Sequence, residues 1–108
     1  VVVTRGHRND LDALEALAPR ELRYLGLIGS RAKVARLYDQ LLSHGRARLE
    51  HLSRIHAPIG LDIGAVTPQE IAVSIVAELI AIRRGKARDI ADASLRWMPK
   101  TTQVPGTP

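Results

Sequence analysis

Short apolar runs alternate with longer amphipathic stretches along this chain. Residues 1–4 (Val-Val-Val-Thr) and 24–28 (Tyr-Leu-Gly-Leu-Ile) are apolar without alternation, a pattern typical of strands buried on both faces. Residues 59–64 (Ile-Gly-Leu-Asp-Ile-Gly) mix glycine with apolar side chains and predict a third short strand with its flanking turns. The pattern therefore predicts three strands.

Helical spacing of apolar side chains fills the intervals between these runs. The first such stretch ends at Pro19, and a one-faced stripe that follows Ser30 stops at Gly45. A later stretch opens with Thr67-Pro68-Gln69-Glu70, which combines an N-cap, a proline at the first helical position and the glutamate of a capping box. The predicted helices cover residues 10–18, 31–44, 47–55 and 67–84, with another short helix within 86–98.

The resulting order, β-α-β-α-α-β-α, is typical of an α/β fold. Strands that alternate with helices indicate a parallel sheet with helices on both faces, here about half of a doubly wound fold. Residues 1–85 are predicted to be the C-terminal part of such a domain, and 86–108 a C-terminal extension or tail without apolar periodicity at its end. Because the chain starts at Val1, within an apolar run and without methionine, we expect it to be a fragment.

The helix predicted over 67–84 is apolar on almost every side. Its polar positions form only a thin stripe of Glu70, Ser74 and Glu78 at intervals of four residues. Such a helix is expected to be buried on most sides, so either a missing half of its own domain or a second subunit in a homo-oligomer should cover it. Glu78 should pair with another group or shift its pKa.

Composition narrows the possible partners. The 108 residues carry 16 Lys+Arg against 11 Asp+Glu, a net charge of +5 that is concentrated in residues 31–54 and 83–100. Basic patches attract phosphates, but single-strand binding also needs stacking aromatics, and the chain has only two tyrosines and one tryptophan. A nucleic-acid partner is therefore not favoured over a solvated basic face.

Other classes of site and partner are also disfavoured. Cysteine is absent, and no His/Asp/Glu spacing resembles a zinc site, so no metal site is predicted. No apolar run approaches the ~20 residues of a membrane span, so no membrane association is predicted. The absence of cysteine is compatible with a reducing compartment, and we expect a cytoplasmic protein.

Polar side chains follow each predicted strand. The first strand leads to His7, the second to Gly29-Ser30-Arg31, and the third contains Asp62 and ends at Gly64, with His56 shortly before it. Because the carboxyl ends of parallel strands meet at one edge of a sheet, these groups should face a common crevice, where ligands bind in such folds. No catalytic residue is assigned.

Each of these positions has two interpretations. Gly29-Ser30-Arg31 could offer helix N–H groups, a hydroxyl and a guanidinium to a phosphate or carboxylate, or be an ordinary serine N-cap beside a solvated arginine. His7 and His56 could bind an anion or transfer a proton, or simply be packed. Asp62 either holds a ligand hydroxyl or amine or ties down the turn that follows it. The dinucleotide fingerprint G-x-G-x-x-G is absent.

Three motifs along the chain, at residues 5–7, 24–31 and 56–75, are similar to those of one protein family. Residues 56–65 (His-Ala-Pro-Ile-Gly-Leu-Asp-Ile-Gly-Ala) and 67–75 (Thr-Pro-Gln-Glu-Ile-Ala-Val-Ser-Ile), together with 5–7 (Arg-Gly-His) and 24–31, resemble the C-terminal domain of the xanthine dehydrogenase accessory (XdhC/CoxI) family. The resemblance covers about residues 1–85.

The resemblance implies a Rossmann-like domain of a maturation factor for molybdenum hydroxylases of the xanthine dehydrogenase type. Such factors bind the molybdenum cofactor, aid its sulfuration together with a cysteine desulfurase, and pass it to the apoenzyme, so they are carriers more than catalysts. The implied cofactor-binding residues are His7, Gly29, Ser30, Arg31, His56, Asp62 and Gly64. The alternative is an NAD(P)-dependent oxidoreductase domain of the same fold.

Overall fold

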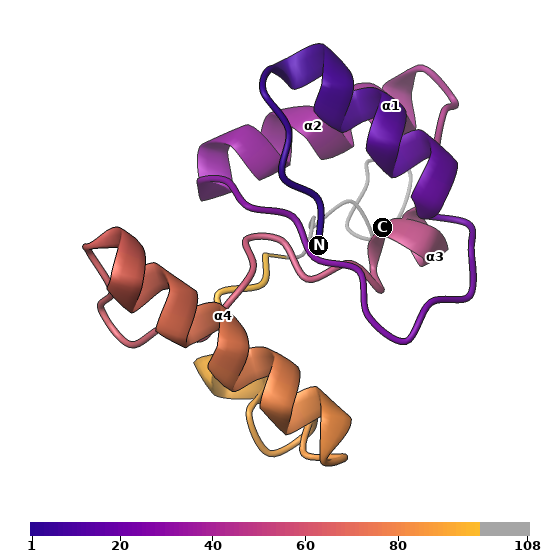
Figure 1. Ribbon diagram of the computed structural model, residues 1–108. Coiled ribbons are helices and arrows are strands. Elements are labelled where there is room, and N and C mark those ends of the chain that lie inside the picture. Colours follow the sequence, from indigo (N-terminus) through magenta and orange to yellow (C-terminus); the bar gives the residue numbers. More distant parts are fainter. Residues whose placement is uncertain (98–108) are drawn as a thin grey trace, which may run out of the picture.

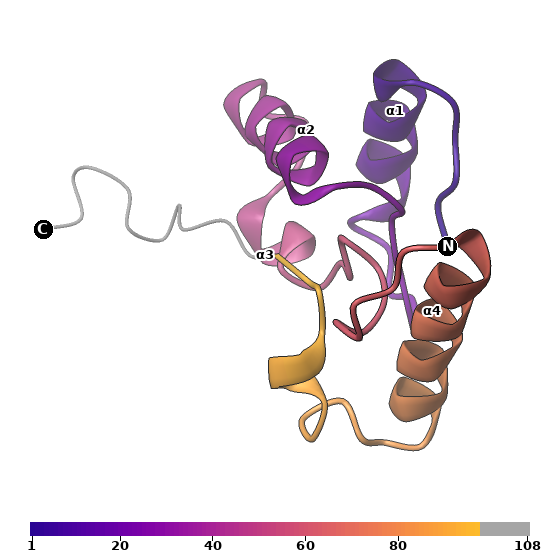
Figure 2. The same cartoon turned by 90° about the vertical axis from the view of Figure 1, so that its left-hand side faces the viewer.

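The computed structural model describes residues 1–97, and helices make up nearly all of their regular structure. The helices are α1 (His7–Leu17), α2 (Arg31–Ser43), α3 (Leu49–Leu52) and α4 (Pro68–Arg83), followed by the 3₁₀ helix η1 (Ala91–Ala93). Helices α1, α2 and α3 gather on one side of the central extended segments, and α4 lies on the other side with η1 (Figures 1 and 2). None of the helices within residues 1–97 combines the length and apolarity that crossing a bilayer requires.

Local signals placed the two longest helices correctly. Helix α2 begins after Ser30, whose hydroxyl accepts a hydrogen bond from the Lys33 amide at 3.1 Å. Helix α4 has the predicted capping box, in which Thr67 and Glu70 bond to each other's backbone N–H groups. These bonds hold the pKa of the exposed Glu70 carboxyl below its usual range, because they favour its charged form.

The other helices differ from the prediction in extent. Helix α1 begins at His7, three residues before the predicted start, and α3 is a single turn within the predicted 47–55. The short helix predicted within 86–98 amounts to the three residues of η1 among those described. Of the predicted extension or tail over 86–108, residues 98–108 lie outside the described residues.

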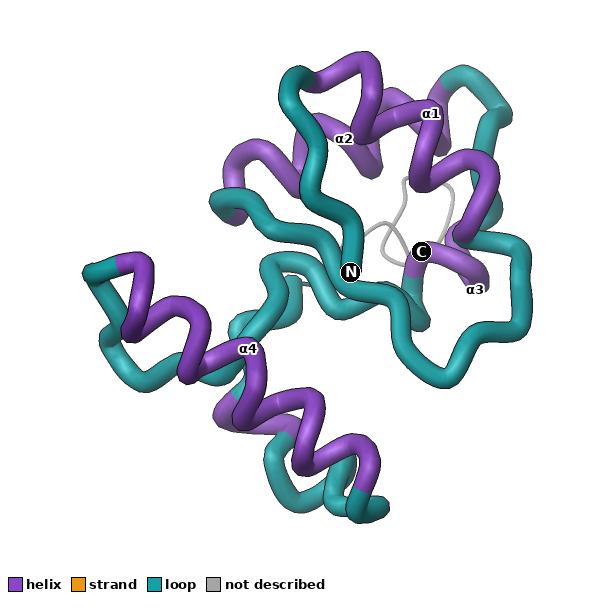
Figure 3. The backbone as a smooth tube through the Cα atoms, in the orientation of Figure 1, coloured by secondary structure: helices purple, strands orange, loops and turns teal. Residues whose placement is uncertain are grey.

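The predicted parallel sheet is wrong. Within residues 1–97 there is no strand, and Figure 3 shows only helices and loops. Two isolated parallel bridges, Val2 with Leu27 and Gly26 with His56, join three extended segments side by side. A third, antiparallel bridge joins Leu61 to Ser94.

Proline helps to explain why the pairing stays this short. The segment that pairs with Gly26 is centred on His56, and Pro58 follows two residues later. Proline has no N–H to donate, so it interrupts a ladder of backbone hydrogen bonds. The pairing resumes only with one bond from the Ile59 amide to the Leu27 carbonyl at 3.1 Å. The predicted third strand, residues 59–64, instead forms a loop.

One hydrophobic core holds the α1–α2–α3 side together. Leu14, Leu37, Leu41 and Leu52 are fully buried there, and Leu27 of the central segment joins them. Burying a leucine is worth roughly 1.5–3 kcal/mol, so this cluster is the main source of stability on this side. Asp10 is also buried; it pairs with Lys33 at 2.6 Å and accepts a hydrogen bond from Thr4.

Helix α4 is buried along part of its polar stripe and exposed over much of its apolar surface. The buried residues are the polar Ser74 and Glu78, whereas Val73, Val76 and Ile80 on the other side are 60%, 51% and 54% exposed. The predicted burial on most sides is therefore not found within the described chain. The physical reason is the loop of residues 58–62, which brings backbone N–H groups to the polar stripe.

Candidate functional site

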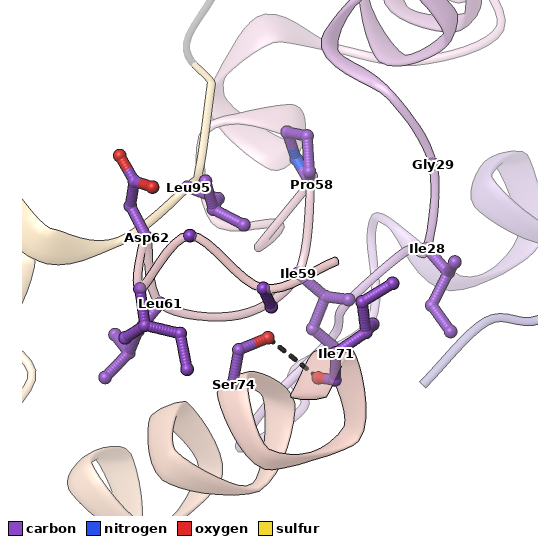
Figure 4. A pocket seen from close by; sticks show the side chains of 12 residues that line it. Ile28, Gly29, Pro58, Ile59, Leu61, Asp62, Ile71, Ser74 and Leu95 are labelled. Atoms are coloured by element: carbon purple, nitrogen blue, oxygen red, sulfur yellow. Dashed lines mark hydrogen bonds between the residues drawn. The ribbon is translucent and has the colours of Figure 1, made fainter. Parts of the chain in front are cut away.

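A cavity of about 330 Å³ lies between the end of the second extended segment, the loop of residues 58–65 and the first turns of α4 (Figure 4). Its walls are mainly apolar, from Ile28, Ile59, Leu61, Ile71 and Leu95. Gly29, Asp62, Gly64 and Ser74 also line it. An apolar cavity with few polar groups at its rim is the common form of a small-molecule site.

The loop that forms one wall is fixed on the polar stripe of α4. The Leu61 amide donates to the Ser74 carbonyl at 3.2 Å, and the Gly60 amide donates to the Glu78 carboxylate at 3.3 Å. Gly60 has φ +108°, and a Cβ there would lie 2.6 Å from Ser74 Oγ. The close approach of loop and helix therefore requires glycine at this position.

Asp62 is the charged group at the cavity. Its backbone is held by a bond from its amide to the Ala93 carbonyl at 2.6 Å. Its side chain is exposed, is directed away from α4 in Figure 4, and has no hydrogen-bond or ion-pair partner within residues 1–97. Among residues 1–97 the Asp62 side chain makes no hydrogen bond to the turn that follows it, and its ligand-binding role stays a prediction.

The start of α2 borders the same cavity through Gly29. The Ser30 side chain caps the helix, and the Lys33 ammonium pairs with Asp10. The aliphatic part of Lys33 lies 3.1 Å from the position that a Cβ on Gly29 would take. Arg31 is exposed and does not line the cavity. The groups left for an anion at this helix start are the first backbone N–H groups and the Arg31 guanidinium.

The two predicted histidines lie away from this cavity. His7 is the first residue of α1, and its ring nitrogen bonds to the side chain of Gln40. His56 stacks on Tyr24, with ring centroids 4.7 Å apart, next to the buried Glu78. The structure thus brings Gly29, Asp62 and Gly64 together at one cavity and leaves His7, Ser30, Arg31 and His56 off its lining. The binding role of each residue stays a prediction.

Glu78 is the centre of a second polar cluster. Its carboxylate is fully buried and accepts hydrogen bonds from the Tyr24 hydroxyl at 2.8 Å and the Ser94 hydroxyl at 2.7 Å, besides the Gly60 amide. The predicted pairing of Glu78 is confirmed. Burial, reinforced by the bond to Glu78, raises the pKa of Tyr24 above its usual range, so this phenol is a donor at neutral pH.

Tyr24, Ser94 and Arg96 were not predicted as parts of any site. Tyr24 and Glu78 are 54 positions apart, and no short motif signals a contact of that range. The buried acid in an apolar helix was the one signal in the sequence, because a buried carboxylate needs donors.

Comparison with known proteins places the chain in a family. Residues 1–79 match the family described as the XdhC Rossmann domain. An uncharacterized protein of Escherichia coli K12, YqeB, is 43% identical over 82 residues, which is 76% of this chain and 15% of that protein. A protein of Bacillus subtilis 168, described as a probable subunit of xanthine dehydrogenase, is 38% identical over 84 residues, 78% of this chain and 23% of that protein. The matched part therefore spans less than a quarter of either relative.

Proposed function

The chain belongs to the XdhC family, and from this premise we propose that it is part of an accessory factor for the maturation of molybdenum hydroxylases of the xanthine dehydrogenase type. In this proposal the cavity beside Gly29 and Asp62 holds one end of the molybdenum cofactor. The cofactor is then sulfurated by a cysteine desulfurase and inserted into the apoenzyme, both in the cytoplasm. The name of the Bacillus subtilis relative supports the link to xanthine dehydrogenase.

The residues of the cavity fit the pterin part of that cofactor. The pterin part of the cofactor is a fused ring system whose pyrimidine edge carries N–H donors. The cavity offers apolar walls and the carboxylate of Asp62, which has no partner within residues 1–97. Its volume of about 330 Å³ is near the lower end of the roughly 300–1,000 Å³ of ligand pockets, which suits one end of a larger cofactor. The observation that carries the proposal is this exposed carboxylate at the rim of an apolar cavity.

The phosphate of the cofactor would lie outside the cavity, at the start of α2. Gly29 lines the cavity and Arg31 follows two residues later, so the first N–H groups of α2 adjoin the same opening. These groups and the Arg31 guanidinium would hold the phosphate. When bound, the cofactor supplies the molybdenum chemistry of the client enzyme; the residues of this chain bind it, orient it and shield its ring from water.

Binding of freshly released molybdenum cofactor, measured by calorimetry without oxygen, tests the proposal. We expect Asp62→Asn to weaken binding roughly tenfold or more, because an amide cannot replace a charged acceptor. Asp92→Asn is the matched control, since Asp92 is an exposed aspartate in η1 that does not line the cavity. Equal affinities of the two variants would contradict the proposal. Saturable binding of NADH in place of the cofactor would favour the oxidoreductase alternative.

A second variant separates the two parts of the cofactor. Arg31→Ala should weaken binding of the intact cofactor by about 1.5–3 kcal/mol and leave the binding of a phosphate-free pterin unchanged. A loss of equal size with both ligands would place Arg31 at the pterin rather than at the phosphate. No loss with either ligand would make Arg31 a surface charge.

A further inference from the structure

A second cavity, of about 360 Å³, lies between the end of α4 and the segment that contains η1. It shares no lining residue with the cavity at Asp62. Its apolar wall consists of Ile82, Ala87, Ile90 and Ala91, and its polar groups come from His56, Ser94 and Arg96. The proposed function does not use it.

Arg96 is the cation of this cavity, and it has no acidic partner among residues 1–97. The Nε atom of its guanidinium is buried and makes no hydrogen bond, and no carboxylate within residues 1–97 forms an ion pair with it. The Arg96 side chain is half-buried, and its buried Nε–H has lost water without replacement, which is costly unless an anion takes its place. An anion that binds next to Arg96 in this cavity would remove this cost.

Glu78, which bonds to Ser94 of this cavity, has hydrogen-bond donors on both carboxylate oxygens. One oxygen accepts from Tyr24 and Gly60 and the other from Ser94, so its carboxylate is fully engaged in holding α4 to the loop. His56 lies between, with its buried Nδ1 at 3.5 Å from the Glu78 carboxylate and without a hydrogen bond. Among the residues that line the cavity, the polar groups are thus the Arg96 guanidinium, the His56 ring and the Ser94 hydroxyl, and none is an acid.

The frame around these groups is fixed by backbone bonds. The Leu95 amide donates to the Gly60 carbonyl at 2.9 Å, and the Trp97 amide donates to the Ala57 carbonyl at 2.8 Å. The Ser94 hydroxyl accepts from the Arg96 amide at 3.2 Å. The guanidinium and the imidazole thus extend from segments held in register, as a preorganised site requires.

We propose that this cavity binds a small organic monocarboxylate, with the carboxylate on Arg96 and His56 and an apolar body against Ile82 and Ile90. The planar guanidinium fork matches a carboxylate. The fixed negative charge of Glu78 behind His56 repels a doubly charged phosphate more than a singly charged carboxylate. The apolar wall favours a short branched or aromatic acid over a purely polar one.

Titration of the ¹⁵N-labelled chain with isovalerate tests this proposal, with the arginine Nε–H signals as the readout. We expect a saturable shift of the Arg96 signal. Neutral isovaleramide should bind at least roughly tenfold more weakly, since it lacks the charge-assisted contact, and inorganic phosphate should bind more weakly than isovalerate. Equal binding of acid and amide, or shifts of equal size at all arginines, would overturn the proposal.

Variants locate the binding at this cavity. Arg96→Gln should lower isovalerate affinity roughly tenfold or more, whereas Arg88→Gln, in an exposed arginine of the same segment that does not line the cavity, should leave it unchanged. Ala91→Leu fills the cavity from its rim and keeps Arg96, so it should also abolish isovalerate binding. This variant tests the site independently, in case Arg96→Gln disturbs folding. Unchanged affinity in Ala91→Leu would overturn the assignment of the site.

Discussion

The inward faces of α2 and α4 differ in chemistry. Helix α2 buries Val34, Leu37 and Leu41 against α1 and the central segments. Helix α4 buries Ser74 and Glu78 against a loop and leaves Val73, Val76 and Ile80 exposed. Burial of apolar side chains holds α2 in place and tolerates small shifts in geometry. Helix α4 depends instead on directional hydrogen bonds. We therefore expect the two sides of the molecule to respond differently to substitution and to pH.

The largest expected effect lies in the apolar core. Leu14→Ala should lower the free energy of unfolding by about 2–5 kcal/mol, because Leu14 is fully buried in α1 and the substitution leaves a cavity. Val76→Ala is the control on α4, where the side chain is 51% exposed and the loss should stay within about 0.5 kcal/mol. Urea denaturation measures both. A cost at Val76 close to that at Leu14 would show that the outer face of α4 is covered in solution.

The next effect lies at the polar contact of α4. Glu78→Gln keeps the size of the side chain but loses the charge of an acceptor that three donors share, so we expect a loss of about 1–3 kcal/mol. Tyr24→Phe removes one of these donors and should cost less. If Glu78→Gln were neutral in urea denaturation, α4 would not depend on these hydrogen bonds.

The close approach of loop and helix has its own test. Gly60→Ala combines a positive φ with a Cβ only 2.6 Å from Ser74 Oγ, so it should cost about 1–3 kcal/mol. Gly45→Ala is the matched control, because Gly45 also has positive φ, +68°, but has no atom within 4 Å of the added Cβ. The difference between the two losses in melting temperature reflects the close contact together with the larger positive φ of Gly60. Equal melting temperatures would mean that loop and helix move apart readily.

The limits of the sequence prediction follow the same division. The limits and caps of α4 were predictable, because Thr67 and Glu70 are near each other in the chain. Which face of α4 is buried could not be predicted, because a 3.6-residue period shows which positions share a face and not what covers that face. The sequence indicated that Glu78 needs a partner, but the Gly60 amide that bonds to it comes from a loop far away in the chain, which the periodicity does not report.

The candidate site shows the same limit. Gly29 and Asp62 were expected in one crevice because each follows an extended apolar segment, and they do line one cavity, although no sheet forms within residues 1–97. The prediction of a sheet was wrong, because apolar runs predict extended segments but not how many of their residues pair. Arg96 carried no signal, since an arginine in a basic segment is usually solvated.

The smallest expected effect is a pH dependence confined to the α4 side. Burial lowers the pKa of His56 below its ordinary value of about 6.5, outweighing the opposite effect of Glu78, and Arg96 lowers it further. The folded state therefore binds this proton less readily than the unfolded state, so the stability that His56 contributes is fully present above about pH 6.5 and is lost as the pH falls through its folded pKa.

Thermal melts between pH 7.5 and pH 5, read against variants, isolate this effect. The wild type should lose more stability over this interval than His56→Gln, in which the titrating group is gone, whereas His44→Gln, in an exposed histidine at the end of α2, should behave as the wild type. Identical pH profiles for the wild type and His56→Gln would mean that the imidazole is hydrated in the folded state. The contact between Tyr24, His56 and Glu78 would then be open to water, and the contrast between the two sides of the molecule would lose its electrostatic part.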